Sequence, residues 1–187
     1  MATPHIEKLE RGHRSLLKGF RNQEGSLVAY LQRFALRHAQ KDLLSRTYLA
    51  IDEGPGGNRV AGYFSLATVS VERASVGRIP LLSKLPRFPI PGVLLARLAV
   101  DERVQGQGLG RYLFEEALGL ALQLAMSGPV AFRLFVADAI SQEAVGFYEK
   151  FGLQRLSSRL PARMVLDIQP LIAEGIGRVR GTRDASS

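Results

Sequence analysis

Apolar residues recur at helical spacing early in the chain, in the segment SLVAYLQRFALRHAQ. Leu27, Leu31, Phe34 and Ala35 fall on one stripe of such a helix, and Ser26 stands where an N-cap residue is expected. The pattern therefore predicts an amphipathic helix that packs on a core through this stripe.

Two segments rich in β-branched and aromatic residues, SRTYLAID and RVAGYFSLATVSV, flank the turn-forming sequence GPGGN. They predict a hairpin of two antiparallel strands. Residues 72–92 then carry four prolines among basic side chains, which indicates a long, irregular and basic connection.

The segment VLLARLAV, residues 93–100, is almost continuously apolar and predicts a strand that is buried on both faces. A glycine-rich stretch follows this strand. From Leu109 onward the apolar residues keep helical spacing until Ser127-Gly128-Pro129, which predicts a long helix between these points.

The remaining chain alternates between strand and helix patterns. AFRLFVAD predicts a strand, SQEAVGFYEKFG a helix capped by Ser141 and ended by Gly152, and LQRLSSRL with ARMVLDI a closing pair of strands. This order predicts one α/β (α+β) domain with a mixed sheet over residues 1–168. The arginine-bearing segment 169–187 is expected to be a flexible tail or a partner-binding arm.

Composition narrows the chemistry. The 187 residues include no cysteine, which excludes disulfides, thiolate nucleophiles and cysteine zinc sites. The three histidines His5, His13 and His38 are scattered, so we expect no metal site. The N-terminus lacks an apolar signal core, and no apolar run approaches the roughly 20 residues of a membrane helix, so we expect a cytoplasmic protein without a membrane anchor.

The net charge of +8, with a pI near 10.3, favours polyanionic partners such as nucleic acid. The ordinary alternative is a charge that only keeps the protein in solution.

The glycine-rich stretch ERVQGQGLGRYL lies between a predicted buried strand and a helix, which is a common arrangement for binding phosphate. It lacks the Gly-Lys-Ser/Thr ending of a Walker A loop, because Gly110 is followed by Arg111 and Tyr112. It also lacks the G-x-G-x-x-G spacing of dinucleotide-binding folds. The loop therefore predicts phosphate binding, but neither of a Walker A type nor of a dinucleotide. The structural alternative is a tight strand-to-helix turn.

The sequence from Gln105 to Gly110, QGQGLG, resembles the pyrophosphate loop of the GNAT superfamily of N-acetyltransferases. The later segment FYEKFGL, residues 147–153, resembles a second motif of that superfamily. The resemblance implies a mixed, mostly antiparallel central sheet flanked by helices, and acetyl-CoA as cosubstrate.

A narrower resemblance covers residues 25–167 and is to the GNAT toxins of toxin–antitoxin modules, although Phe20-Arg21-Asn22-Gln23 replaces a short Asp-Cys-Gly turn of many relatives. It implies acetylation of the α-amino group of aminoacyl-tRNA, inhibition of translation, a ribbon-helix-helix antitoxin and a homodimer. The alternatives are acetylation of protein N-termini or small amines, and a non-catalytic acetyl-CoA-binding or nucleic-acid-binding domain.

The resemblance also assigns residues to the cosubstrate. The main chain of Leu98, Ala99 and Val100 is expected to pair with the pantetheine arm. The pyrophosphate is expected to contact the amides of Gln105, Gly106, Gln107, Gly108, Leu109, Gly110 and Arg111, the last with its side chain as well, and Ser141 completes the cosubstrate set.

Tyr148 is the candidate acid for the departing thiolate, because a positioned phenol with a pKa near 10 can donate a proton to it. Its alternative role is that of a core aromatic residue beside Phe147 and Phe151.

An α-amine whose pKa lies near 8 needs little help from a general base, whereas a lysine side chain, with a pKa of about 10.4, would need strong deprotonation.

Four cations are candidates for contacting RNA. Arg97 interrupts an apolar strand, so it either pairs with a carboxylate or faces a polar site. The basic loop supplies the other three candidates, for which a solvated surface is the alternative: Arg78, Lys84 and Arg87.

Overall fold

The computed structural model describes residues 4–54, 57–76 and 88–174, without the side chains of residues 73 and 74. The chain divides into two compact units. Unit 1 comprises residues 1–68 and 95–118, and unit 2 comprises residues 69–94 and 119–187.

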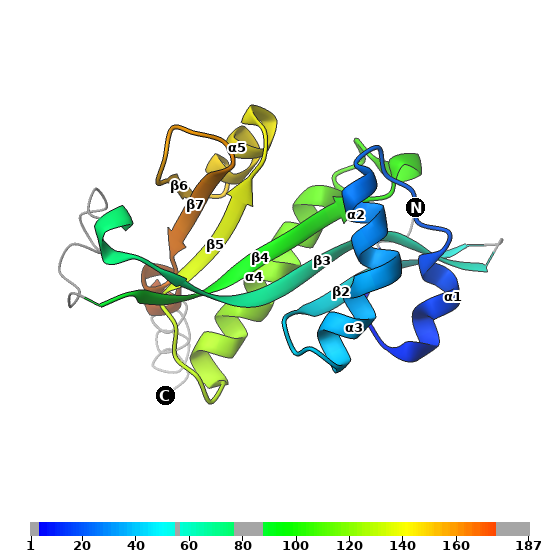
Figure 1. The fold of residues 1–187 in the computed structure, drawn as a ribbon, viewed down its shortest axis with the longest axis horizontal. Coiled ribbons are helices and arrows are strands. Elements are labelled where there is room, and N and C mark those ends of the chain that lie inside the picture. The colour runs from blue at the N-terminus through cyan, green and yellow to red at the C-terminus, as the bar shows by residue number, and fades with distance from the viewer. Residues whose placement is uncertain (1–3, 55–56, 77–87, 175–187) are drawn as a thin grey trace, which may run out of the picture. The chain divides into compact units, whose positions relative to one another are not determined.

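Unit 1 holds the first four strands, which are hydrogen-bonded in the order β1-β2-β3-β4 (Figure 1). Its elements are β1 (His5–Lys8), η1 (Arg11–His13), α1 (Arg14–Leu17), α2 (Gly25–Ala29), the π-helical turn η2 (Tyr30–Phe34), α3 (Ala35–Gln40), β2 (Arg46–Gly54), most of β3 (Gly57–Val71), the second half of β4 (Ile90–Val100), η5 (Glu102–Val104) and the first half of α4 (Leu109–Ser127).

The β2–β3 hairpin is confirmed, with an antiparallel register and a bulge between Ala50 and Ile51. Thr47 and Ser65 are directly opposite one another, and their buried hydroxyl groups share a 2.8 Å hydrogen bond. Burial of two polar groups is tolerated here because each satisfies the other.

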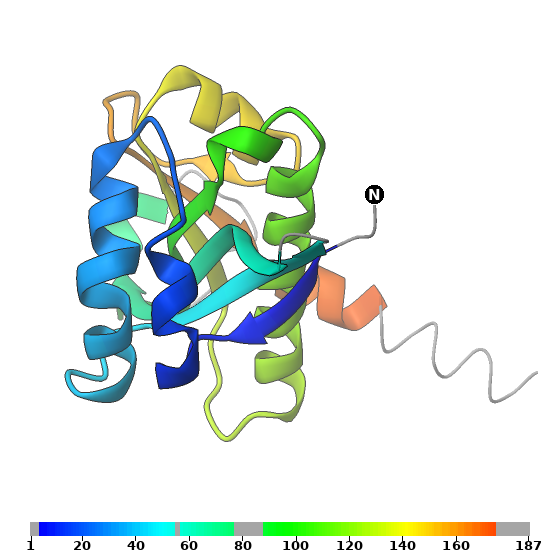
Figure 2. The same ribbon diagram turned by 90° about the vertical axis from the view of Figure 1, so that its right-hand side faces the viewer.

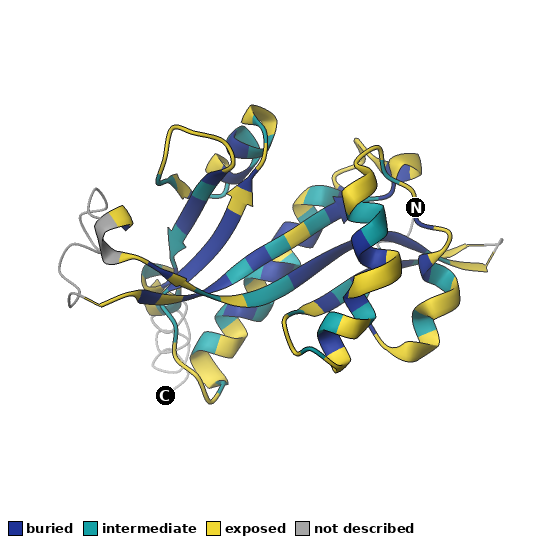
Figure 3. Ribbon diagram, in the orientation of Figure 1, coloured by how far each residue is buried: buried dark blue, intermediate teal, exposed yellow. Residues whose placement is uncertain are grey.

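The helices α1 to α3 lie on one face of the unit 1 strands, and α4 lies on the other (Figure 2). The middle parts of β2 and β3 are largely buried, whereas β1 is mostly exposed (Figure 3). Gly62 on β3 permits this close packing, because a Cβ there would stand 2.7 Å from Leu113 Cδ1 and 2.9 Å from the Ala99 carbonyl oxygen. One cluster of buried hydrophobic residues in unit 1 contains Leu9, Leu17, Phe20, Tyr30, Leu31, Ala35, Leu49, Ile51, Val60, Tyr63 and Ala99.

The amphipathic helix predicted near the start is present as the continuous run α2-η2-α3, but two details were wrong. The N-cap is Glu24, whose side chain accepts a hydrogen bond from the Ser26 amide, so Ser26 is already inside the helix. Phe34 is 45% exposed, because the five-residue π turn at 30–34 shifts the apolar stripe away from it. The sequence pattern also missed β1 and α1.

Unit 2 contains strands in the order β4-β5-β7-β6, with β5–β7 and β7–β6 antiparallel. Its elements are the ends of β3 and α4, η3 (Arg73–Val76), the start of β4, β5 (Leu134–Ala139), α5 (Gln142–Glu149), β6 (Gln154–Arg155) and β7 (Ala162–Asp167). One cluster of buried hydrophobic residues in unit 2 contains Val71, Val76, Ile90, Leu134, Val136 and Val165. The order of elements agrees with the predicted mixed α/β fold.

Several predicted boundaries needed correction. The strand β4 begins at Ile90, inside the expected irregular connection, and β5 begins at Leu134 because its hydrogen bonds to β7 start there. The strand expected over LQRLSSRL is reduced to the two residues of β6, since only these pair with β7. Residues 169–174 of the expected tail are helical.

The end points of two helices are confirmed. The helix α4 spans Leu109–Ser127, and α5 has Ser141 as its N-cap and ends before Gly152, whose φ is +83°. Within the described residues, none of the helices has both the length and the hydropathy needed to cross a bilayer.

Candidate active site

The end of β4 leads directly into the glycine-rich loop. Ala99 is buried, whereas Leu98 and Val100 are partly exposed. The Val100 carbonyl accepts hydrogen bonds from two side-chain amides, at 2.8 Å from Asn22 Nδ2 and at 3.3 Å from Gln105 Nε2. Because these two bonds use both lone pairs of the Val100 carbonyl oxygen, a ligand that pairs with this segment like a strand must bond to its other main-chain groups.

A buried carboxylate fixes the start of the loop. Asp101 accepts hydrogen bonds from the Arg103 side chain at 2.7 Å and from the backbone amides of Arg103 and Arg21. Burial favours a higher pKa for Asp101, but these donors outweigh it and lower the pKa of the carboxyl. Arg103 also donates to the Gly19 carbonyl, so this cluster ties the loop to residues 19–21.

Two of the three glycines in the loop adopt backbone conformations that L side chains rarely adopt. Gly106 has a φ of +78° and Gly108 a φ of +84°, and a Cβ at either position would meet no atom within 4 Å. The main chain is therefore open to a ligand at both positions. The amides of Leu109 and Gly110, in the first turn of α4, have no acceptor within the helix by geometry, which suits an anion.

The side chain of Arg111 is exposed and forms a 2.7 Å ion pair with Glu115 one turn along α4. Its 73% exposure leaves the guanidinium accessible to an anionic ligand, with Glu115 as a competing partner.

Tyr148 is in unit 2, near the end of α5. The residue is buried, with 9% exposure, and its ring lies edge-on to that of Phe147, with the ring centroids 5.3 Å apart. Burial, with a smaller contribution from the charge of Asp138, raises the pKa of Tyr148 to about 12. The phenol therefore keeps its proton at neutral pH.

The surroundings of Tyr148 are held by local capping. The Ser141 hydroxyl accepts a hydrogen bond from the Ala144 amide at 3.2 Å and so begins α5, which is a structural role for this predicted cosubstrate residue. The Tyr148 carbonyl accepts from the amides of Phe151 and Leu153 at the other end. Asp138 is paired with Arg163 across β5 and β7 by two 2.9 Å hydrogen bonds.

A comparison with known families identifies an acetyltransferase (GNAT) domain over residues 44–155. The chain belongs to the GNAT acetyltransferase family. This acetyltransferase is 36% identical over 160 residues to a tRNA-acetylating toxin of Mycobacterium tuberculosis, an alignment that covers 83% of this chain and 89% of the relative.

Two solved structures share the fold of this acetyltransferase. A crystal structure of a KacT mutant matches with a TM-score of 0.80 at 23% identity, over 90% of this chain and 97% of that one. AtaT complexed with acetyl-methionyl-tRNAfMet matches with a TM-score of 0.78 at 25% identity, over 89% of this chain and 96% of that one. The predicted GNAT fold is thereby confirmed.

As a GNAT enzyme, the protein is an N-acetyltransferase that uses acetyl-CoA. The open glycine turn fits the pyrophosphate of that cosubstrate, because anion binding requires accessible main-chain amides. Among the described residues, no group of three or more His, Asp or Glu side chains is arranged to hold a metal ion.

Of the four residues predicted to contact RNA, the structure describes Arg97 alone. The strand around Arg97 is not buried on both faces, because Arg97 is exposed and its guanidinium lies 5.0 Å from the centroid of the Tyr30 ring. Within the described residues Arg97 forms no ion pair, and its guanidinium donates to the Ala96 carbonyl at 2.6 Å. Arg78, Lys84 and Arg87 lie outside the described residues.

Sequence reasoning missed the contacts of Asn22 and of the Asp101–Arg103 pair. Asn22 bonds to Val100, 78 residues away, and the Arg21 amide bonds to Asp101, 80 residues away, so no local pattern could reveal these two contacts. Arg103 lies only two residues after Asp101. A charged residue directly after an apolar strand was the available signal for Asp101.

Proposed function

We propose that this enzyme is the toxin of a toxin–antitoxin system, which acetylates the α-amino group of aminoacyl-tRNA and so inhibits translation. The observation that carries the proposal is the 36% identity to a tRNA-acetylating toxin over most of both chains. The charge of +8 supports it, because a polyanionic substrate is attracted to a basic protein.

On the donor side, we assign the pyrophosphate to the amides from Gln105 to Arg111 and the pantetheine arm to the main chain of Leu98–Val100. The left-handed turns at Gly106 and Gly108 support this role, since they leave the backbone accessible. Bound acetyl-CoA supplies the activated acetyl group as a thioester. The side chains of Asn22 and Gln105 orient the end of β4 through the Val100 carbonyl.

Tyr148 acts as the proton donor for the sulphur that leaves when the amine nitrogen bonds to the acetyl carbon. With its pKa raised to about 12, the phenol remains protonated throughout the working range of pH. Complete transfer to a thiolate with a thiol pKa near 8.5 is uphill by roughly 5 kcal/mol. We therefore assign Tyr148 a hydrogen bond to the developing thiolate, with the proton moving as the sulphur departs and being regained from solvent.

The acceptor needs little help from the protein. A free α-amine has a pKa near 8, and the neighbouring ester of an aminoacyl-tRNA lowers it further, so the amine is largely neutral at working pH. The amine proton can therefore pass to solvent without a dedicated base. This chemistry favours an α-amine over the side chain of a protein lysine.

The proposed partners follow from the same family. We propose that a ribbon-helix-helix antitoxin neutralises the enzyme, that the enzyme is a homodimer, and that it works in the cytoplasm, where charged tRNA is used. AtaT bound to the C-terminus of the antitoxin AtaR and a KacTA–DNA complex are structures with the same fold.

The test is incubation of the purified enzyme with labelled acetyl-CoA and a mixed pool of aminoacyl-tRNAs. We expect label in the RNA fraction, and mild base should release an N-acetyl amino acid that mass spectrometry identifies. Deacylated tRNA is the matched control and should remain unlabelled. Label that appears only in added proteins or small amines would contradict the proposal.

A further inference from the structure

A groove in unit 1 is lined by five exposed cations and has a volume of about 640 Å³. The cations are Arg11 and Arg14, at the start of the short helices, and Arg33, Arg37 and Lys41, along η2, α3 and its C-cap. Two glutamines and Leu36 complete the lining, which contains no carboxylate. We call this feature the basic groove.

Most of the positive charge of the basic groove is not neutralised. Arg37 pairs with Asp42 at 2.8 Å, but no ion pair among the described residues involves Arg14, Arg33 or Lys41. The Arg11 guanidinium donates to the Gln40 side-chain oxygen at 3.1 Å, a neutral partner that orients it without cancelling its charge. Like charges gathered on one surface repel one another, and a bound anion relieves that repulsion.

The spacing of these cations suits a repeating anion. Arg33, Arg37 and Lys41 follow one another at intervals of four residues, which corresponds to a rise of roughly 6 Å between neighbours along a helix. Arg11 and Arg14, which belong to η1 and α1, line the same groove. Arginine guanidinium groups bind phosphate through two parallel hydrogen bonds, which makes them well suited to a sugar–phosphate backbone.

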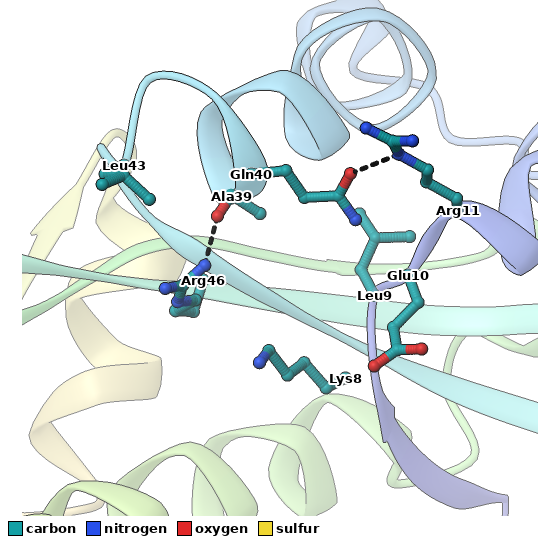
Figure 4. A pocket seen from close by; sticks show the side chains of 8 residues that line it. All are labelled: Lys8, Leu9, Glu10, Arg11, Ala39, Gln40, Leu43 and Arg46. Carbon is teal, nitrogen blue, oxygen red and sulfur yellow. Dashed lines mark hydrogen bonds between the residues drawn. The ribbon is translucent and has the colours of Figure 1, made fainter.

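The positive surface continues beyond the groove. Arg11 and Gln40 also line a neighbouring hollow of about 450 Å³, together with Lys8 and Arg46 (Figure 4). Arg46 donates to the Ala39 carbonyl there, and Glu10 is the acidic residue of the lining. A strand of phosphates leaving the basic groove would therefore meet further cations.

We propose that the basic groove binds the phosphate backbone of the aminoacyl-tRNA substrate; this rests on the proposed function. Leu36 is the single apolar side chain in the lining. An acidic peptide that orders on binding needs apolar anchors to offset its loss of entropy, whereas a nucleic-acid backbone is bound mainly through its charges. The lining therefore favours RNA over an acidic peptide.

The test removes three cations that form no ion pair among the described residues, as Arg14→Gln/Arg33→Gln/Lys41→Gln. It measures tRNA binding by filter retention at several salt concentrations. We expect affinity at 0.15 M salt to fall roughly tenfold to a hundredfold, and the slope of log K against log salt to become less steep by about 2 to 3. In steady state, KM for aminoacyl-tRNA should rise by a similar factor while kcat and the affinity for acetyl-CoA stay near wild type.

Matched controls distinguish the effect of cations in the basic groove from the effect of the net charge of the protein. The variant Arg14→Lys/Arg33→Lys/Lys41→Arg keeps every charge and should retain the wild-type salt slope. Lys41→Gln is compared with Lys18→Gln, since Lys18 is exposed but does not line the groove, and Lys41→Gln should weaken tRNA binding more.

The outcomes distinguish the groove from the function. Acetylation of tRNA with an unchanged salt slope and KM in the triple glutamine variant would overturn the groove and leave the function standing. Groove-dependent tRNA binding without acetylation by the wild type would support the groove and contradict the function. Displacement of tRNA by poly-glutamate at equal charge concentration would overturn the assignment to RNA.

Discussion

The buried carboxylate of Asp101 joins the glycine-rich loop to residues 19–21, and its replacement by asparagine measures the strength of that junction. Asp101 accepts four hydrogen bonds, two from the Arg103 guanidinium at 2.7 Å, one from the Arg103 amide at 3.0 Å and one from the Arg21 amide at 2.9 Å. Its side chain is 2% exposed, whereas that of Arg103 is 39% exposed.

The magnitude follows from these contacts. Asp101→Asn preserves the shape, but it removes the charge and turns one acceptor into a donor that faces other N–H groups. A hydrogen bond to a charged group contributes about 1.5–3 kcal/mol, and removal of one member of a buried ion pair costs about 3–5 kcal/mol. Because Arg103 is partly hydrated and keeps its bond to the Gly19 carbonyl, we expect a loss of about 2–4 kcal/mol in the free energy of unfolding.

Urea unfolding followed by circular dichroism at pH 7 measures this loss. The matched control is Asp52→Asn, since Asp52 pairs with Arg59 at 2.6 Å in the more exposed β2–β3 hairpin. We expect that variant to lose less than about 1 kcal/mol, as surface ion pairs do. A loss below 1 kcal/mol in Asp101→Asn as well would refute the inferred importance of the buried cluster.

The pH dependence of the stability of wild type and of Asp101→Asn tests whether the charge of Asp101 is responsible for the loss. The pKa of Asp101 is lowered in the folded state, so its contribution is present above the unfolded value of about 3.9 and is lost as pH falls through the lower folded value. The difference in stability between wild type and Asp101→Asn should therefore shrink on acidification below pH 4. A difference that stays constant down to pH 2 would show that the charge of Asp101 is not responsible.

Three further predictions concern the donor loop and the tyrosine. Gly106→Ala and Gly108→Ala should each lower the free energy of unfolding by about 1–2 kcal/mol and raise KM for acetyl-CoA, because both glycines have a positive φ. The control Gly119→Ala, on the open side of α4, should be neutral or slightly stabilising in thermal unfolding. Tyr148→Phe should keep the fold and the affinity for acetyl-CoA in calorimetry but lower kcat by roughly 10²- to 10⁴-fold, and unchanged turnover would remove Tyr148 from the mechanism. Since burial raises the pKa of Tyr148 to about 12, the wild-type rate should rise as the amine is deprotonated and then stay level up to pH 10, measured at short times because the ester hydrolyses in base; a fall with a midpoint below 10 would contradict protonated Tyr148 as the donor.

The sequence predicted those elements whose signals are local. The β2–β3 hairpin follows from alternating residues around a glycine turn, and α5 from a serine N-cap and a closing glycine. The strand β1 and the helix α1 have four residues each, too few to display a period, and β1 exists because it pairs with β2. Element boundaries moved where pairing between strands, and not local pattern, decides them.

The candidate site divides in the same way. The glycine loop and the tyrosine segment are contiguous motifs, so the sequence was sufficient to propose them. The glycine loop is supported by long-range contacts, because Asn22 donates to the Val100 carbonyl and the Arg21 amide donates to Asp101. A sequence of this kind indicates which backbone can hold an anion, but the groups that fix that backbone become visible only when the chain is folded.

The helix run α2-η2-α3 shows why the basic groove could not be predicted from the sequence. Its apolar stripe predicted the face that packs in the core, and the sequence pattern assigned no role to its polar face. Arg33, Arg37 and Lys41 do share that face, yet a row of cations on a helix is ordinary in a solvated surface. Arg11 and Arg14, distant in sequence, turn the row into a groove lined by cations from two parts of the chain. Because binding to a polyanion depends on how many charges one surface presents together, this convergence makes the groove a stronger candidate for RNA than any single basic segment.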